Sequence, residues 1–175
     1  MTEPVTTAAE LRFPGNEPGK RVHCGACQRL GHCRLGIEAD RFDGASGIFH
    51  VELRCPSDHE GGPQVAHGGW TASVLDEVLG LVPILHGGAA VTGRLEVVYI
   101  RPVPIERALV AQASLERRDG RRWYVNGELR LAATGAELAR ATGIWVERAP
   151  RHFERHQAWL AGEEAAAARS EPIPR

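Results

Sequence analysis

The pattern of apolar and polar residues changes its period along the chain. Residues 47–53 alternate apolar and polar positions, which predicts a half-buried strand. From about Trp70 to Leu85 the apolar residues recur at helical spacing and form a wide apolar face, and Pro83 is expected to kink or end this helix. Because few polar residues interrupt it, we expect other elements to wrap around the helix.

Four strand-like segments follow the helix, with no second helical pattern between them. They cover approximately residues 89–101, 108–118, 122–132 and 136–148. Asp119-Gly120 and Thr134-Gly135 separate the last three segments, and Asp-Gly in such a place is a strong hairpin signal. One strand, one apolar helix and four further strands predict an α+β fold, in which a curled antiparallel sheet is wrapped around one central helix.

The chain of 175 residues suits one principal domain, which we expect to cover residues 41–149. Residues 1–40 are predicted to form an N-terminal arm with a cysteine-rich segment, and prolines and glycines make its beginning loosely packed. Residues 150–175 carry a few large apolar residues among charged ones, which predicts a helical tail.

Composition and charge narrow the class of partner. The 21 Lys and Arg nearly balance the 22 Asp and Glu, so the chain carries no electrostatic footprint for nucleic acid or for an anionic membrane. Residues 1–12 contain no apolar run, so no signal peptide is expected, and no segment is expected to span a membrane. The four cysteines are therefore predicted to be reduced thiols in the cytoplasm.

Two features at and inside the predicted helix can carry chemistry. After His67, Gly68 and Gly69 leave backbone N–H groups unobstructed at the positive end of the helix, which suits either an oxyanion hole or a simple hinge. Asp76 lies among apolar residues, with small residues one turn away on either side. Its carboxylate can act as a general base or nucleophile, or it can form a solvated stripe with Glu77.

The combination of these features resembles a known family. The stretch from His59 to Gly80 places Asp76 nine residues after the His-Gly-Gly motif, and the stretch from Val91 to Pro104 follows it. Both resemble the PaaI-like acyl-CoA thioesterases of the hotdog superfamily, over roughly residues 45–148. The resemblance implies the hotdog fold and hydrolysis of acyl-CoA, with no cofactor and no metal.

The resemblance also implies a role for each matching position. Asp76 matches the aspartate that activates water or attacks the thioester carbonyl, and His67 matches the histidine that helps to position the thioester. The amide of Gly68 or Gly69 matches the group that polarises the carbonyl oxygen. In this family the site forms between two subunits, which implies a homodimer or a homotetramer built from two dimers.

The chain departs from the family pattern at Gly61, where many members carry an asparagine six residues before the histidine. This departure favours the branch of the family that has an Asp-Glu pair and a threonine at the start of the next strand. Thr92 matches that threonine, and Glu77 is then a second candidate acid. Trp70 is bulkier than the residue expected at its position, and we predict that it shapes or narrows the acyl pocket.

Three arginines are candidates for binding the phosphates of coenzyme A, because a guanidinium group matches phosphate geometry. They are Arg101, Arg121 and Arg122. The alternative interpretation is that they are ordinary surface residues beside a hairpin.

The segment from His23 to Cys33 contains a Cys-x-x-Cys pair followed by His-Cys. A structural zinc site, a redox pair and simple packing of small residues are three interpretations of it. The gap between Cys27 and His32 is short compared with zinc-finger spacings, which favours packing over a site formed by Cys24, Cys27, His32 and Cys33.

The predicted function is therefore hydrolysis of an acyl-CoA thioester. A non-catalytic module that binds acyl-CoA is the alternative, and a hotdog hydratase is less favoured because its catalytic histidine belongs to a different motif. The length of the acyl chain, and the choice between coenzyme A and acyl-carrier protein, stay open.

Overall fold

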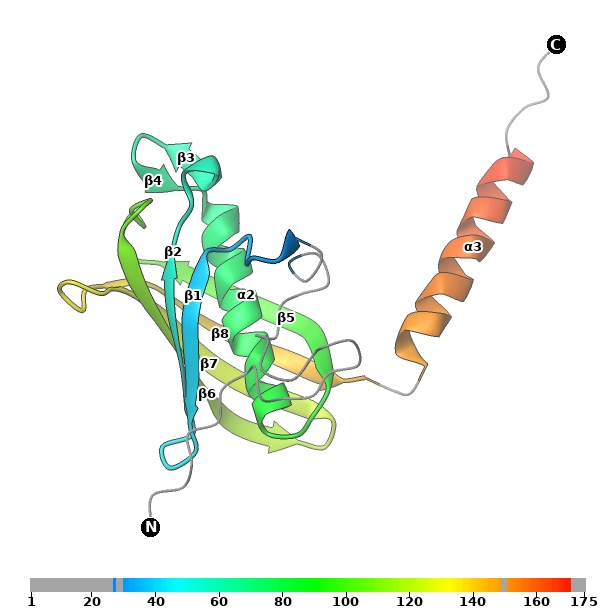
Figure 1. The fold of residues 1–175 in the computed structure, drawn as a ribbon. Coiled ribbons are helices and arrows are strands. Elements are labelled where there is room, and N and C mark those ends of the chain that lie inside the picture. The colour runs from blue at the N-terminus through cyan, green and yellow to red at the C-terminus, as the bar shows by residue number, and fades with distance from the viewer. Residues whose placement is uncertain (1–26, 28–29, 149–150, 171–175) are drawn as a thin grey trace.

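The computed structural model describes residues 27, 30–148 and 151–170, with side chains up to residue 166 (Figure 1). In this part of the chain the predicted strand, central helix and four later strands are all present in the predicted order. One strand before β2, which is β1, and the short elements η2, β3 and β4 between β2 and α2 were not predicted. The elements are β1 (Ile37–Asp43), β2 (Ile48–Arg54), the 3-10 helix η2 (Ser57–His59), β3 (Glu60–Gly62), β4 (Val65–Ala66), α2 (Gly68–Leu85), β5 (Ala90–Tyr99), β6 (Ala108–Asp119), β7 (Arg122–Leu131), β8 (Glu137–Glu147) and α3 (His152–Ser170).

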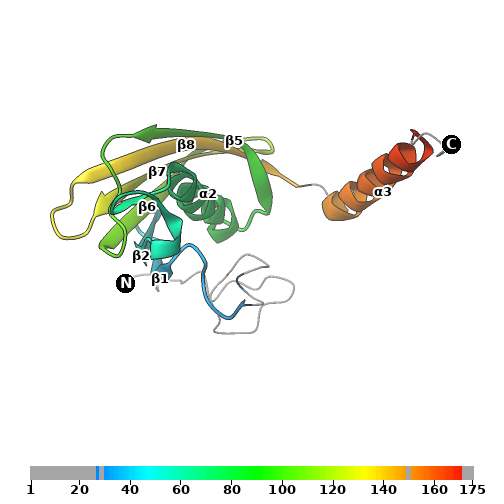
Figure 2. The ribbon, with the colours of Figure 1, turned by 90° about the horizontal axis from the view of Figure 1, so that it is seen from above.

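Six strands form one antiparallel sheet in the order β1-β2-β6-β7-β8-β5. The sheet curls around α2, as the view along the helix shows (Figure 2). β1 and β5 are the two edge strands, so each has one side without a strand partner in the described chain. The predicted curled sheet around one central helix is therefore confirmed.

The core lies between α2 and the concave face of the sheet. Alternate residues of β2 point inward, as the alternation predicts, and Phe49, Val51 and Leu53 are all buried. α2 begins two residues earlier than predicted, and Pro83 does not end it, because the helix continues to Leu85. A proline in the last turn removes only one hydrogen bond to the preceding turn, so this helix tolerates it.

A bulge in β5 decides which of its side chains face α2. The pairing of β5 with β8 shifts between Thr92 and Arg94, so Gly93 is the extra residue. Leu95 and Val97 pack against the core, whereas Thr92, three residues before Leu95, also reaches α2. Strict alternation would have turned Gly93 toward the helix instead. The bulge therefore places the Thr92 hydroxyl on the helix side.

The residues just before α2 form a small hairpin, β3 and β4, for which the sequence analysis predicted no strand. Two backbone hydrogen bonds hold the hairpin in place. The Ala66 N–H donates to the Val103 carbonyl (2.8 Å), and the His67 N–H donates to the His59 carbonyl (2.8 Å). A Cβ atom on Gly61 would lie 2.6 Å from the His67 Cα. An asparagine at position 61 would therefore clash, which gives the departure from the family pattern a structural cause.

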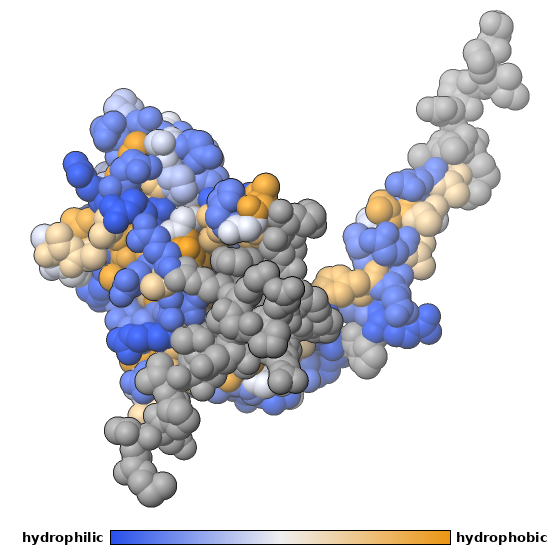
Figure 3. Space-filling view, in the orientation of Figure 1, coloured by the Kyte–Doolittle hydropathy of each residue, from blue (hydrophilic) through white to orange (hydrophobic). Residues whose placement is uncertain are grey.

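α3 is a helix of 19 residues within residues 150–175, for which the sequence predicted a helical tail. Both ribbon views show it apart from the sheet (Figures 1 and 2). Its large apolar residues Phe153, Trp159 and Leu160 are exposed, and apolar and polar surface alternate along the helix (Figure 3). Most of the predicted N-terminal arm, including Cys24, lies outside the described residues.

Contrary to the sequence expectation, one helix is long and apolar enough to cross a membrane by length and composition alone, and it is α2. Half of it is buried inside the fold, and the sheet curls around it. The core helix of a globular domain has the same length and composition, so this feature is explained by burial in the core.

Candidate active site

The first turn of α2 leaves one of the two predicted oxyanion donors available. His67 caps the helix, and its Nδ1 accepts a hydrogen bond from the Gly69 N–H (2.9 Å). The Gly69 N–H is therefore already occupied, and the neutral imidazole carries its proton on Nε2. Within the described residues the Gly68 N–H has no hydrogen-bond partner. Of the two glycines, the structure therefore favours Gly68 as the donor.

Tyr99 joins this turn to β5, although the sequence analysis gave it no role. Its hydroxyl donates a hydrogen bond to the Gly68 carbonyl (2.9 Å), and its side chain is 55% exposed. A Cβ on Gly68 would be in ordinary contact with the Tyr99 ring at 3.6 Å. The end of the edge strand therefore fixes the orientation of the peptide group that follows Gly68.

In the middle of α2 the structure brings Asp76 and Thr92 together. The Thr92 hydroxyl donates a hydrogen bond to the Asp76 Oδ1 (2.8 Å). Asp76 is half-buried and Thr92 is exposed, so the pair lies at the open seam between α2 and β5. No described residue donates a hydrogen bond to the second carboxylate oxygen, Oδ2. That oxygen is available to accept a proton from water.

Asp76 and Glu77 do not form the shared solvated stripe that the sequence allowed. Glu77 is directed away from the open face that carries Asp76. Successive helical residues differ by about 100° around the axis. Burial raises the pKa of the Glu77 carboxyl, and the negative charge of Asp76 raises it further. Glu77 also contributes to the raised pKa of the Cys33 thiol, which places it beside the segment before β1.

Replacing Glu77 by glutamine is expected to raise the melting temperature at neutral pH. Because the folded-state pKa of Glu77 is above its ordinary value of 4.5, folding favours the protonated form. The contribution of protonated Glu77 to the free energy of unfolding is fully present below the ordinary pKa of its carboxyl group. This contribution is lost as the pH rises through the raised pKa of the folded state. Calorimetry of both proteins between about pH 4 and pH 8 should show melting temperatures that diverge as the pH rises.

The matched control for this substitution is Glu163→Gln, which changes an exposed glutamate of α3. Its melting temperature should follow that of the wild type at every pH. A difference between wild type and Glu77→Gln that is constant over the whole pH range would mean that ionisation of Glu77 is not the cause.

The two groups of candidate residues are far apart within one chain. Nine helical residues from His67 to Asp76 correspond to a rise of about 13 Å. The first group, at the start of α2, consists of His67, Gly68 and Tyr99, and the second, in the middle of the helix, consists of Asp76 and Thr92. A single thioester group cannot contact both of them in one subunit.

A cavity of about 290 Å³ opens beside Gly68. Arg101 is at its exposed rim, where Nη1 donates a hydrogen bond to the Glu137 carbonyl (2.7 Å). Trp70 is buried in the core and does not line this cavity, and its indole N–H has no partner among the described residues. If Trp70 shapes an acyl pocket here, as predicted, it therefore does so by packing behind the residues that line the cavity.

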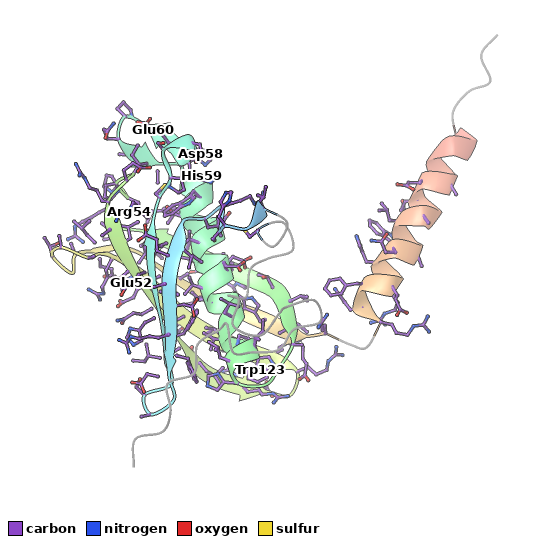
Figure 4. The ribbon with its side chains drawn as sticks, viewed as in Figure 1. Glu52, Arg54, Asp58, His59, Glu60 and Trp123 are labelled. Carbon is purple, nitrogen blue, oxygen red and sulfur yellow. The ribbon has the colours of Figure 1, made fainter. Side chains whose placement is uncertain are left out.

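The three candidate arginines do not gather at one place. Arg121 and Arg122 are exposed at the hairpin between β6 and β7, near the beginning of β5, and Arg121 Nη2 donates to the Glu147 carbonyl (2.6 Å). Arg101 follows the other end of β5. Figure 4 shows these two ends of the sheet, with Trp123 at the hairpin end and the η2–β3 residues at the other.

The described cysteines are thiols. Cys27 is buried and its Sγ accepts a hydrogen bond from the Arg34 N–H (3.3 Å), and burial raises the pKa of the Cys55 thiol to about 12. Among the described residues, no three His, Cys, Asp or Glu side chains are arranged to hold a metal ion. These contacts fit the packing interpretation of the segment, and Cys24 lies outside the described residues.

The chain is similar in sequence to known thioesterases. Residues 63–136 match the family model of the thioesterase superfamily. The acyl-coenzyme A thioesterase THEM4 of Bos taurus is 30% identical over 91 residues, which are 52% of this chain and 37% of the relative. The chain thus spans only about a third of the length of that relative.

Two solved structures share the fold. The E. coli PaaI protein from the phenylacetic acid degradation operon is 20% identical with a TM-score of 0.61, over 72% of this chain and 86% of that chain. A Streptococcus mutans UA159 protein with bound acetyl CoA is 22% identical with a TM-score of 0.55, over 58% and 82%.

A curled antiparallel sheet that surrounds one long helix, with candidate catalytic groups along the seam between helix and edge strand, is the hotdog fold of thioesterases. The part of the chain that carries the site, residues 63–136, is similar to the thioesterase superfamily.

Proposed function

We propose that the protein hydrolyses acyl-CoA thioesters with Asp76 as the general base. The hydrogen bond from Thr92 to Asp76 carries this proposal, because it orients a half-buried carboxylate at an open seam and leaves one oxygen available. The similarity to an acyl-coenzyme A thioesterase supports the thioester, and a fold shared with a protein that binds acetyl CoA supports the coenzyme.

In the proposed reaction Asp76 takes a proton from a water molecule as the water oxygen bonds to the thioester carbonyl carbon. The carbonyl oxygen becomes an oxyanion, which the Gly68 N–H and the positive end of α2 stabilise. The carbon–sulfur bond then breaks, and the thiolate of coenzyme A receives the proton from Asp76. The products are a carboxylic acid and a free thiol.

We further propose that each site is shared between two subunits of a homodimer. Within the described part of the chain the edge strand β5 has no strand on one side, and it exposes Val98 and Tyr99, so a second copy can continue the sheet there. An antiparallel pairing about a two-fold axis near the middle of β5 would bring Asp76 close to the partner subunit's Gly68. This arrangement removes the separation of about 13 Å within one chain.

The same pairing would gather the candidate phosphate contacts. Arg121 and Arg122 are near the beginning of β5, and Arg101 follows its end. In an antiparallel pair the beginning of one β5 lies beside the end of the other. The three arginines would then surround one site, where they could bind the phosphates of coenzyme A.

Purified protein is expected to release free thiol from acyl-CoA substrates, as measured with a chromogenic thiol reagent. The panel should contain short, medium, long and aromatic acyl groups, and each should also be offered on acyl-carrier protein. This range is needed because the seam between α2 and β5 is open to solvent and does not by itself determine the length or type of the acyl chain. A protein that binds coenzyme A in calorimetry but releases no thiol from any substrate would instead be a non-catalytic binding module.

A further inference from the structure

The cavity beside Gly68 has an apolar interior with one polar side chain. Its most buried lining residues are Ala66, Thr71 and Val103, whereas Gly68 and Tyr99 are exposed at its mouth. Thr71 is 1% exposed and is the one buried polar residue of the described core. The interior therefore presents a single hydroxyl group among apolar walls.

The Thr71 hydroxyl has no hydrogen-bond partner among the described residues. Its oxygen is also not one of the fully enclosed unpartnered atoms, which are the indole nitrogens of Trp70 and Trp123. The hydroxyl is consequently open to the cavity and not sealed in the core. A buried hydroxyl without a partner is unfavourable, so the position favours a ligand atom that completes the hydrogen bond.

We propose that this cavity is the acyl pocket and that Thr71 determines its specificity, by selecting acyl groups that carry a hydroxyl or keto oxygen. The proposal rests on the proposed function, in which the Gly68 N–H at the mouth of the cavity holds the thioester oxygen. Thr71 is three residues further along α2, a rise of about 4.5 Å. An oxygen on the second or third carbon beyond the thioester carbonyl would reach it.

The size of the cavity fits a compact acyl group. Its 290 Å³ is about twice the volume of an engineered cavity of about 150 Å³ that binds benzene. A ring with a substituent or a short branched chain fills such a space, and the apolar walls bury its carbon atoms. The single hydroxyl then distinguishes an acyl group that has an oxygen from one that has none.

The test compares two matched pairs of substrates, 3-hydroxyhexanoyl-CoA with hexanoyl-CoA and 3-hydroxybenzoyl-CoA with benzoyl-CoA. Wild-type protein is expected to prefer the hydroxylated member of at least one pair by on the order of tenfold in kcat/KM. In Thr71→Val, which keeps the shape and removes the hydroxyl, that ratio should fall to about one. Thr71→Ser should restore the preference.

Thr142→Val is the matched control, because it removes an exposed threonine hydroxyl from the outer face of β8. Its ratio should equal that of the wild type. Equal losses for both members of a pair in Thr71→Val would assign Thr71 a purely structural role. A wild-type protein that hydrolyses hexanoyl-CoA and benzoyl-CoA without preferring either hydroxylated substrate would overturn the pocket assignment and leave the proposed function intact.

A wild-type protein that hydrolyses neither these four substrates nor any other member of the acyl-CoA panel would refute the proposed function instead. The pocket is then tested by binding alone, with analogues in which a methylene group replaces the thioester sulfur. Calorimetry should still show tighter binding of the hydroxylated analogue by wild type and not by Thr71→Val. Equal affinities for the two analogues would overturn the pocket assignment as well.

Discussion

Replacing Asp76 by asparagine is expected to lower kcat for acyl-CoA hydrolysis by about a thousandfold, because an amide cannot accept the proton of the attacking water. The side chain keeps its shape, and its oxygen can still accept the hydrogen bond from the Thr92 hydroxyl. The fold and the affinity for coenzyme A should therefore persist. Steady-state thiol release and calorimetric binding of coenzyme A measure the two effects separately.

Asp58→Asn is the control for the loss of a carboxylate, because Asp58 is exposed in η2 and away from the seam between α2 and β5. It should hydrolyse acyl-CoA at the wild-type rate. An Asp76→Asn protein with the full rate, together with an inactive Glu77→Gln protein, would transfer the role of base to Glu77. Loss of coenzyme A binding in Asp76→Asn would indicate a structural defect instead.

The sequence predicted the fold well, because the fold depends mainly on periodicity. The helix of α2 and the four strands after it show their periods over ten or more residues, and their predicted bounds are within two residues of the observed ones. The hairpin of β3 and β4 was missed. Its strands have only three and two residues, and contacts with Val103 and Pro104, about forty residues away, hold them in place.

The sequence offered candidate residues for the site but not their arrangement, and the roles of these residues stay predictions. Thr92 reaches Asp76 because of a bulge at Gly93, which no alternation pattern reveals. The choice of Gly68 over Gly69 depends on the rotamer of His67, whose ring turns back to its own helix. The raised pKa of Glu77 comes first from burial and then from the charge of Asp76, and Glu77 in turn acts on the thiol of Cys33, which is distant in sequence.

The proposed role of Gly68 is to donate its backbone N–H to the oxyanion, and replacing a side chain cannot test a backbone group. Gly68→Pro removes this N–H at the first position of a helix, where proline is favoured. His67, with φ of −59° and ψ of 136°, already has the extended conformation that precedes proline. We expect kcat to fall by about a hundredfold, the effect of losing one oxyanion donor, with an unchanged melting temperature.

Gly68→Ala is the matched control, because it keeps the N–H and its Cβ makes an ordinary contact with the Tyr99 ring at 3.6 Å. It should remain active, and an equal loss in both variants would attribute the effect to shape. Refolding Asp76→Asn together with Gly68→Pro then tests the shared site. Random pairing makes half of the dimers mixed, and each mixed dimer has one intact site, so about a quarter of the wild-type activity should return. A site contained within one subunit would recover none, because every subunit carries a defect.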